Sequence, residues 1–287
     1  MNRKLVGRVY PETHYRVTAA AAQSYARAIN EDNPVFFEPG PGGALLAPPL
    51  FSAVFHPPAL GKAIADPELG MDFKRALHGE QDMRFHAPIR AGDRISTSVR
   101  IESIEEKPSG ETICLALESH NQDRRPVDTT LFTLFVRSRR AVAEPASLAP
   151  REVSKTLSDP MLAVTQQFDA DQTFRYAEAS GDRTAIHLDD AVARKAGLPG
   201  IIGHGLCTMA FISKVFIDHF AAGEPTRLAR MALRFARPVF PAQKIETRIE
   251  EAGIRESARL YRFETYNPKN ESVIRAGVAE VRSEEVG

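Results

Sequence analysis

The chain has 287 residues, of which 43% are hydrophobic and 26% are charged, as in ordinary soluble globular proteins. Its 37 basic residues balance 37 acidic ones, so we expect no long-range attraction to nucleic acid or to an anionic membrane. No apolar run approaches the roughly 20 residues that cross a bilayer, and the N-terminal residues lack the apolar core of a signal peptide. Cys114 and Cys207 are too few for a disulfide framework or a zinc site. We therefore expect a cytoplasmic protein that binds neither nucleic acid nor membranes.

The first half carries a helix, a turn and a second helix before its strands. AAAAQSYARAIN (residues 19–30) predicts a short helix, NEDNPVFF (30–37) a polar turn, and LLAPPLFSAVF (45–55) an apolar helix. Strands follow from MRFHAPIRAGDRI onward. This half gives an N-terminal unit over residues 1–140.

A linker separates the two halves. AVAEPASLAPREVSKT (residues 141–156) is rich in Ala, Pro and Ser and lacks helical or strand periodicity, which is typical of a surface linker. The C-terminal unit then covers residues 157–287.

The second half repeats the order of elements. DADQTFRYAEAS (169–180) predicts a short helix, SGDRTAIHLDD (180–190) a polar turn, and GLCTMAFISKVFIDHF (205–220) a helix apolar on nearly every side, which we expect to be buried. Four strand-like segments with alternating character follow, and AGI (252–254) and NPKNE (267–271) look like turns between them. A buried helix wrapped by an antiparallel sheet, twice over, predicts an α+β arrangement.

The halves also match in sequence, as two copies of one unit do. MRFHAPIRAGDRI matches LRFARPVFPAQKI at an offset of 150 residues, and ESHNQDRRPV matches ETYNPKNESV further on. NEDNPVFF lines up with GDRTAIHL upstream of both.

SGDRTAIH followed by GIIGHGLCTMAFIS resembles the MaoC-like, (R)-specific enoyl-CoA hydratases and 3-hydroxyacyl-thioester dehydratases. The family has an Asp, an Asn-Pro two and three residues later, and a His five residues after the Asp. Asp182 and His187 have that spacing here, and Thr184-Ala185 replace Asn-Pro. The resemblance is dense in the second half and weaker in the first, and it implies a double hotdog fold, in which each sheet wraps around a long helix.

The resemblance also implies roles for particular residues. Asp182 and His187 would share acid–base work through one water, and the Gly205 amide at the start of a helix would stabilise the oxyanion. Ser213 would hydrogen-bond Asp182 and fix its orientation. His204 would shape the loop before the helix, with substrate contact as its alternative role.

The first half serves as an internal control for these residues. The repeat places Glu31 at the position of Asp182 and Phe36 at that of His187, and the apolar helix of the first half has no His-Gly. Only the second half therefore carries the candidate acid–base residues and the His-Gly. Phe36 and Phe51 could line an acyl pocket, although core packing is the better explanation of apolar residues at these positions.

Simpler explanations remain for each polar group. Asp182 after a glycine is by itself an ordinary turn residue or helix cap. Asp189 and Asp190 favour a helix cap over a metal site, and Cys207 favours a buried, inert thiol. His78, in an HxxxD pattern without companion motifs, is interpreted as lying just before a strand. No nucleotide-binding motif is present.

The sequence thus predicts an enzyme that hydrates trans-2-enoyl thioesters of coenzyme A or acyl carrier protein to (R)-3-hydroxyacyl thioesters, or runs the reverse dehydration, in fatty-acyl metabolism. No metal or other cofactor is expected, and the protein could be a monomeric double hotdog or a homodimer. A non-catalytic acyl-thioester-binding subunit and a hotdog thioesterase are the alternatives, because one fold hosts several chemistries.

Overall fold

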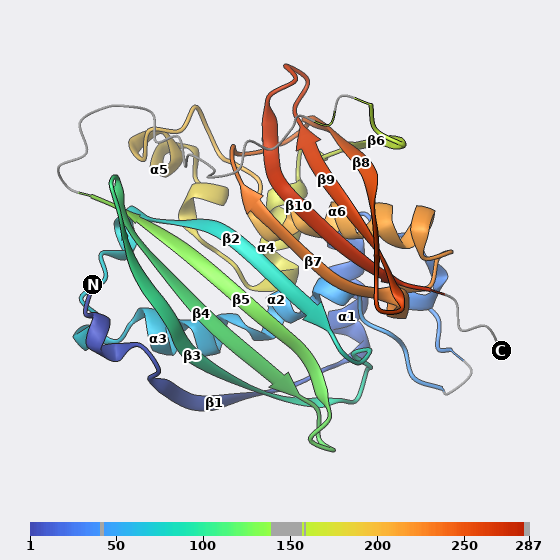
Figure 1. The fold of residues 1–287 in the computed structure, drawn as a ribbon, viewed down its shortest axis with the longest axis horizontal. Helices are drawn as coiled ribbons and strands as arrows, with labels where there is room; N and C mark the ends of the chain where they lie inside the picture. Colours follow the sequence, from blue (N-terminus) through green and yellow to red (C-terminus); the bar gives the residue numbers. More distant parts are fainter. Residues whose placement is uncertain (41–42, 139–156, 158, 284–287) are drawn as a thin grey trace.

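The computed structural model describes residues 1–40, 43–138, 157 and 159–283. Its strands form one ten-stranded antiparallel sheet in the order β1-β3-β4-β5-β2-β7-β10-β9-β8-β6 (Figure 1). The first five strands of that order belong to the N-terminal half and the other five to the C-terminal half. The linker expected at 141–156 lies outside the described residues.

The elements have the following bounds. The strands are β1 (Val9–Arg16), β2 (Ala76–Phe85), β3 (Arg94–Lys107), β4 (Gly110–His120), β5 (Pro126–Arg137), β6 (Leu162–Gln167), β7 (Leu228–Phe235), β8 (Lys244–Arg255), β9 (Ala258–Tyr266) and β10 (Ser272–Arg282). The α-helices are α1 (Ala19–Ala28), α2 (Ser52–Phe55), α3 (Pro57–Ile64), α4 (Gln172–Ser180), α5 (Asp190–Lys195) and α6 (Gly205–Phe220). Short 3-10 turns include η2 (Pro34–Phe36), η3 (Pro49–Phe51), η6 (Ala185–His187) and η7 (Pro225–Arg227).

The two halves join edge to edge through β2 and β7, and the pairing shows their internal symmetry. Asp82 pairs with Ala232, the residue at the same position of the repeat, 150 residues later. Away from that pair, Glu80 lies opposite Arg234 and Arg84 opposite Arg230. A pseudo-two-fold axis therefore passes through the Asp82–Ala232 pair, and the internal repeat is confirmed.

Charged side chains close the same seam. Arg230 binds Asp82 with Nη2 and Oδ2 2.7 Å apart, and Arg234 binds Glu80 at 2.5 Å. These arginines are thus occupied by carboxylates of the other half.

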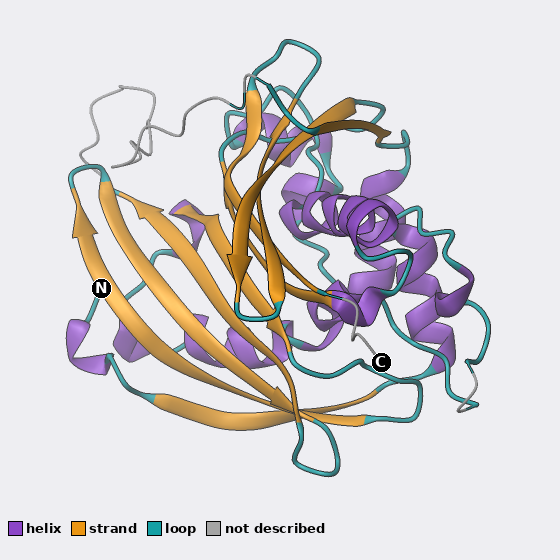
Figure 2. Cartoon of the chain, turned by 45° about the vertical axis from the view of Figure 1, so that its right-hand side comes forward, coloured by secondary structure: helices purple, strands orange, loops and turns teal. Residues whose placement is uncertain are grey.

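Helix α6 occupies the centre of the C-terminal half, and the helices lie on the inner side of the curved sheet (Figure 2). The 16 residues of α6 are buried on almost every side of the helix. They belong to a hydrophobic core that also includes strands β7–β10 and residues of the first half. The corresponding stretch of the first half is divided into η3, α2 and α3, because prolines interrupt a continuous helix there. The predicted α+β double hotdog is confirmed.

One predicted turn is wrong. AGI at 252–254 lies inside β8, and the chain reverses later, at Glu256 and Ser257. Gly253 has φ +122° and marks a register shift between β8 and β9, so the glycine serves a β-bulge and not a turn. The turn expected at NPKNE is present between β9 and β10.

Among the described residues, no helix combines the length and apolarity that spanning a bilayer would require.

Candidate active site

The polar turn that carries Asp182 follows directly from the end of α4. Gly181 adopts a left-handed conformation, φ +79°, which ends the helix and turns the chain. Ser180 Oγ donates to the carbonyl oxygen of Tyr176 (2.7 Å) and accepts from the Asp182 amide (3.2 Å). The position of Asp182 is therefore fixed by backbone contacts of the preceding helix.

Thr184 holds the Asp182 carboxylate. The amide and the hydroxyl of Thr184 both donate to Asp182 Oδ1, at 3.1 and 2.6 Å. This is an Asx-turn reinforced by a side-chain hydroxyl. Oδ2 has no hydrogen-bond partner in the part of the chain that the structure describes, so it is the oxygen that can receive a water or a substrate proton.

His187 is the last residue of η6, and one of its nitrogens is already used. Its Nδ1–H donates to the carbonyl oxygen of Ile202, 2.9 Å away. A carbonyl can only accept, so this bond places the proton on Nδ1 and leaves Nε2 with a free lone pair. His187 is thus oriented as a proton acceptor.

His204 joins the turn to α6. Its Nε2–H donates to the backbone oxygen of Asp182 (3.0 Å), and its ring lies between those of Tyr176 and His187. The side chain is 2% exposed, and its Nδ1 has no partner among the described residues. These contacts agree with a loop-shaping residue.

Gly205 begins α6, where amides have no partner within the helix and the helix dipole is positive. A Cβ added at Gly205 would lie 2.9 Å from the ring of Phe235. Glycine is therefore required by the packing against Phe235, in addition to any role of its amide.

Three further predicted site residues make backbone or core contacts. The expected hydrogen bond from Ser213 to Asp182 is wrong: Ser213 Oγ donates to the Ala210 oxygen one turn back on α6, and Thr184 takes the orienting role. Phe36 and Phe51 are both 0% exposed and belong to hydrophobic clusters, as core packing predicts. A substrate contact by either phenylalanine stays a prediction.

The other polar residues follow their simpler explanations. Asp189 caps α5 by accepting from the amides of Ala191 (2.8 Å) and Val192 (3.1 Å). Cys207 is 1% exposed, and burial raises the pKa of its thiol, so it is a poor nucleophile.

The electrostatics favour a charged Asp182 beside a neutral His187. Burial alone would raise the pKa of Asp182, but hydrogen bonds from Thr184 and the two nearby imidazoles lower it below its usual value. Burial lowers the pKa of His187, although the Ile202 carbonyl and Asp182 oppose this. Burial and the proximity of His187 lower the pKa of His204 to about 4. At neutral pH the site holds one carboxylate and two neutral imidazoles.

The same three residues are the ones to test as metal ligands. Asp182, His187 and His204 offer ligand atoms that lie within 4.8 Å of one another. The two imidazoles are stacked, with centroids 3.8 Å and ring planes 28° apart, so their lone pairs lie in separate, nearly parallel planes and are poorly placed to meet at one ion. A tetrahedral ion needs converging lone pairs. That no metal binds here stays a prediction, and the stacking supports it.

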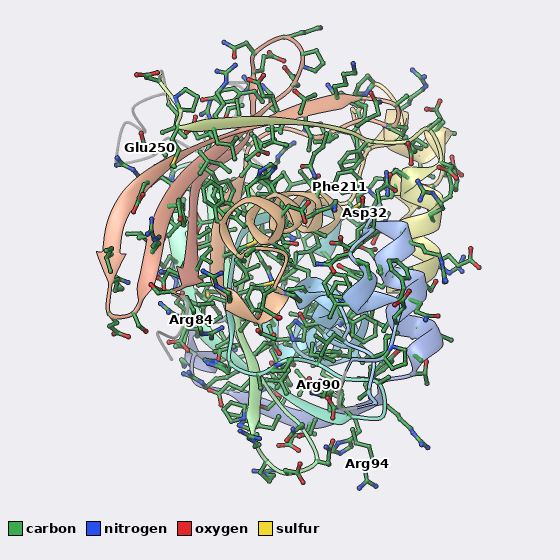
Figure 3. The ribbon with its side chains drawn as sticks, turned by 90° about the vertical axis from the view of Figure 1, so that its right-hand side faces the viewer. Asp32, Arg84, Arg90, Arg94, Phe211 and Glu250 are labelled. Atoms are coloured by element: carbon green, nitrogen blue, oxygen red, sulfur yellow. The ribbon has the colours of Figure 1, made fainter. Side chains whose placement is uncertain are left out.

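Glu31 occupies, in the first half, the position equivalent to Asp182. Its Oε1 accepts from the Asp32 and Asn33 amides, both at 3.1 Å, and from Lys214 of α6 at 3.2 Å. Lys214 also binds Asp32 and Asp218, and Figure 3 shows Asp32 beside α6. The carboxylate of the first half is therefore neutralised by a lysine of the second.

His78 was not predicted as a site residue. It lies on β2 of the first half, yet its ring packs against Phe235, and the Asp182 carboxylate acts on its pKa. Its local HxxxD pattern does not point to Asp182, because the two residues are far apart in the chain. Comparing the repeats offers one signal: the equivalent position in the second half, 150 residues later, is Leu228, so the polar side chain of His78 is not part of the shared pattern.

The fold is a double hotdog, and the comparisons with known proteins agree with it. A MaoC like domain is matched over residues 150–273, and a FAS1-like dehydratase domain region over residues 4–130. The chain belongs to the MaoC-like dehydratase family.

The chain is similar to relatives that carry functional names. The chain is 26% identical over 245 residues to a probable enoyl-CoA hydratase 2 of Dictyostelium discoideum, covering 80% of this chain and 79% of the relative. It is 29% identical over 175 residues to 3-hydroxyacyl-thioester dehydratase Y of Mycobacterium tuberculosis, covering 60% of each. A MaoC-like dehydratase from Phytophthora capsici has the same fold, with a TM-score of 0.81 at 21% identity and 99% of both chains covered.

Proposed function

We propose that the protein hydrates trans-2-enoyl thioesters to (R)-3-hydroxyacyl thioesters, or catalyses the reverse dehydration. The observation that carries the proposal is the convergence of an Asp182 carboxylate, a His187 with a free Nε2 and the start of α6 at one place. The names of the two relatives support the same reaction class.

The arrangement suits the proton transfers of hydration. Water adds OH to C3 and one proton to C2, so the site must accept a proton from water and return one to carbon. Asp182 Oδ2 and His187 Nε2 are two acceptors that can hold the same water. Thr184 fixes the first acceptor and the Ile202 carbonyl fixes the second.

The thioester oxygen gains negative charge when water adds. The Gly205 amide, with the positive end of the α6 dipole behind it, is the donor we assign to that oxygen. His204 links Gly205 to the turn by bonding the backbone of Asp182, so donor and base keep a fixed separation. Neither a metal nor a redox cofactor is needed for this reaction.

The acyl group is carried by coenzyme A or by an acyl carrier protein, and the protein acts as a monomer or a homodimer. A cytoplasmic location belongs to the same proposal, and it is supported by the two cysteines, which are both unpaired.

The experiment that tests this function follows two products at once. Purified protein is incubated with trans-2-enoyl-CoA, and 3-hydroxyacyl-CoA and free coenzyme A thiol are measured together, with chiral analysis of the hydroxy acid. Formation of the (R)-hydroxyacyl thioester without thiol release supports the proposal. Release of thiol would establish a thioesterase instead, and tight binding without either product would establish a binding subunit.

A further inference from the structure

Three aromatic rings from both halves of the chain meet at the end of β7. The His78 ring on β2 has its centroid 4.1 Å from that of Phe132 on β5 and 4.6 Å from that of Phe235 on β7. Phe235 in turn packs against Gly205, where an added Cβ would come within 2.9 Å of its ring. One ring therefore separates His78 from the start of α6.

A β-bulge brings His78 to this position. The register between β2 and β5 shifts between His78 and Glu80, and the β2–β7 ladder begins only at Glu80. Bulges at the end of a ladder re-aim the neighbouring side chain. His78 thus projects where β2 and β7 cease to pair, at the edge of the catalytic site.

Gln81 fixes the ring of His78. Gln81 is 2% exposed, and its Oε1 lies 3.0 Å from His78 Nε2. An amide oxygen only accepts, so Nε2 carries the proton and Nδ1 is left as an acceptor.

The pseudo-two-fold axis provides an internal comparison. The counterparts of His78 and Phe235 are Leu228 and Phe85, and both line a pocket of the first half together with Pro49. Pro49 is the counterpart of Gly205. Each follows by two residues an amide that donates to a backbone oxygen of its own half: Ala47 to Ile89 in the first half, and Gly203 to Val239 in the second. The same three positions thus surround a pocket beside the half without the Asp–His pair. The position of His78 is taken there by Leu228, although His86 also lines that pocket.

We propose that His78 is a substrate-contact residue of the catalytic site, whose neutral ring forms, with Phe235, the wall beside Gly205 and holds the bound acyl thioester against the Gly205 amide. This inference rests on the proposed function, because it takes an acyl thioester as the ligand. It makes the site composite: the half that lost the acid–base pair still supplies one wall of it.

The charge state of His78 agrees with this role. Burial lowers the pKa of His78 to about 4, against the opposing effects of Gln81, the Glu80 backbone and the Asp182 carboxylate. The ring is therefore neutral at pH 7 and places no cation beside the thioester. It offers an apolar face and one acceptor nitrogen.

The test separates binding from chemistry. His78→Leu introduces the residue of the counterpart position. His86→Leu is the matched control, since His86, just after β2, also bonds a side chain through Nε2 (to Thr129 Oγ1 of β5, 2.7 Å) but lies outside the proposed catalytic site. Binding of saturated butyryl-CoA, which cannot be hydrated, is measured by calorimetry with Asp182→Asn alone and with each substitution added. Steady-state kinetics with 2-enoyl-CoA follow for the same substitutions in the otherwise unchanged chain.

We expect His78→Leu to weaken butyryl-CoA binding and to lower kcat/KM by about tenfold, with the melting temperature within a few degrees of the parent. His86→Leu should change neither. Unchanged binding and kinetics in His78→Leu would overturn the inference while leaving the hydratase intact. If His78→Leu does not fold, His78→Gln, which keeps a polar side chain of similar reach, must show the loss of binding. Binding of butyryl-CoA without any hydration by the wild type would instead overturn the proposed function, and failure to bind it would overturn both.

Discussion

The imidazole rings of His187 and His204 stack, with centroids 3.8 Å apart and planes 28° from parallel. Two protonated rings at this distance would repel each other, so the stack favours the neutral form of both. Each ring has one nitrogen committed to a backbone oxygen. His204 is 2% exposed, so its second nitrogen is buried, and the ring of His187 is the one that we propose exchanges protons. The stack therefore keeps the base of the site uncharged.

The pH profile should reflect this arrangement. His187 must be neutral to accept a proton, and burial lowers its pKa from the usual 6.5. We expect kcat/KM for hydration to be constant near pH 7 and to fall with decreasing pH only below 6.5, where His187 becomes protonated. An NMR titration of the His187 ring should give the same midpoint. An acid limb centred above pH 6.5 that follows His187 would contradict the account.

Thr184 should act through Asp182. Thr184→Val removes the hydroxyl that donates to Asp182 Oδ1 and keeps the backbone donor, so kcat should fall by about tenfold and the pKa of Asp182 should rise. The pH profile and kcat of the variant measure both effects.

Thr226→Val is the matched control for this substitution. The amide and hydroxyl of Thr226 donate to Glu224 Oε1 in the same i, i+2 arrangement at η7. This variant should retain full activity. Equal kinetics for the two variants would show that Thr184 has no special relation to the catalytic carboxylate.

Gly205→Ala should impair the reaction through packing. Its methyl group would lie 2.9 Å from the Phe235 ring, so the ring or the start of α6 must move, and we expect kcat to fall by about tenfold or more. Gly61→Ala on α3 is the control, because a Cβ there meets nothing within 4 Å. Phe235→Leu combined with Gly205→Ala should recover part of the loss. A Gly205→Ala enzyme with wild-type kcat would rule out this account of the glycine.

Lys214 should stabilise the fold by pairing the buried Glu31. Lys214→Met leaves a carboxylate of 2% side-chain exposure without its cation, which should lower the free energy of unfolding by about 2–3 kcal/mol. Adding Glu31→Gln removes the unpaired carboxylate and should restore most of the lost free energy of unfolding. Urea unfolding of the single and double variants gives the coupling, and purely additive losses would argue against it.

The repeat and the motif spacing were enough to predict much of the molecule. Two copies at an offset of 150 residues predicted the pseudo-symmetric halves, and the turn after α4 placed Asp182 and His187 together. His204 and Gly205 followed from the resemblance to the MaoC-like family, and the position of Gly205 before an apolar helix explained the role of its amide. These features depend on local sequence and on the order of elements, which a single chain displays.

Contacts between distant residues were harder to predict. Helical spacing can place Ser213 on a face of α6, but it cannot choose between a partner across the site and the Ala210 carbonyl one turn back. The distance from His78 to Asp182 depends on the pairing of β2 with β7 and on a bulge, neither of which a local pattern specifies. Gly253 shows the same limit, since a glycine serves a bulge or a turn equally well.

The most direct test of the central claim is the loss of conjugated enoyl-thioester absorbance when the protein is added to trans-2-enoyl-CoA of several chain lengths. Wild type, Asp182→Asn and His187→Ala run side by side, with Glu31→Gln as the control from the catalytically empty half. We predict turnover by the wild type and by Glu31→Gln, and a loss of about a hundredfold or more in the other two. Full activity in well-folded Asp182→Asn or His187→Ala would contradict the account, because the reaction would then not depend on the pair.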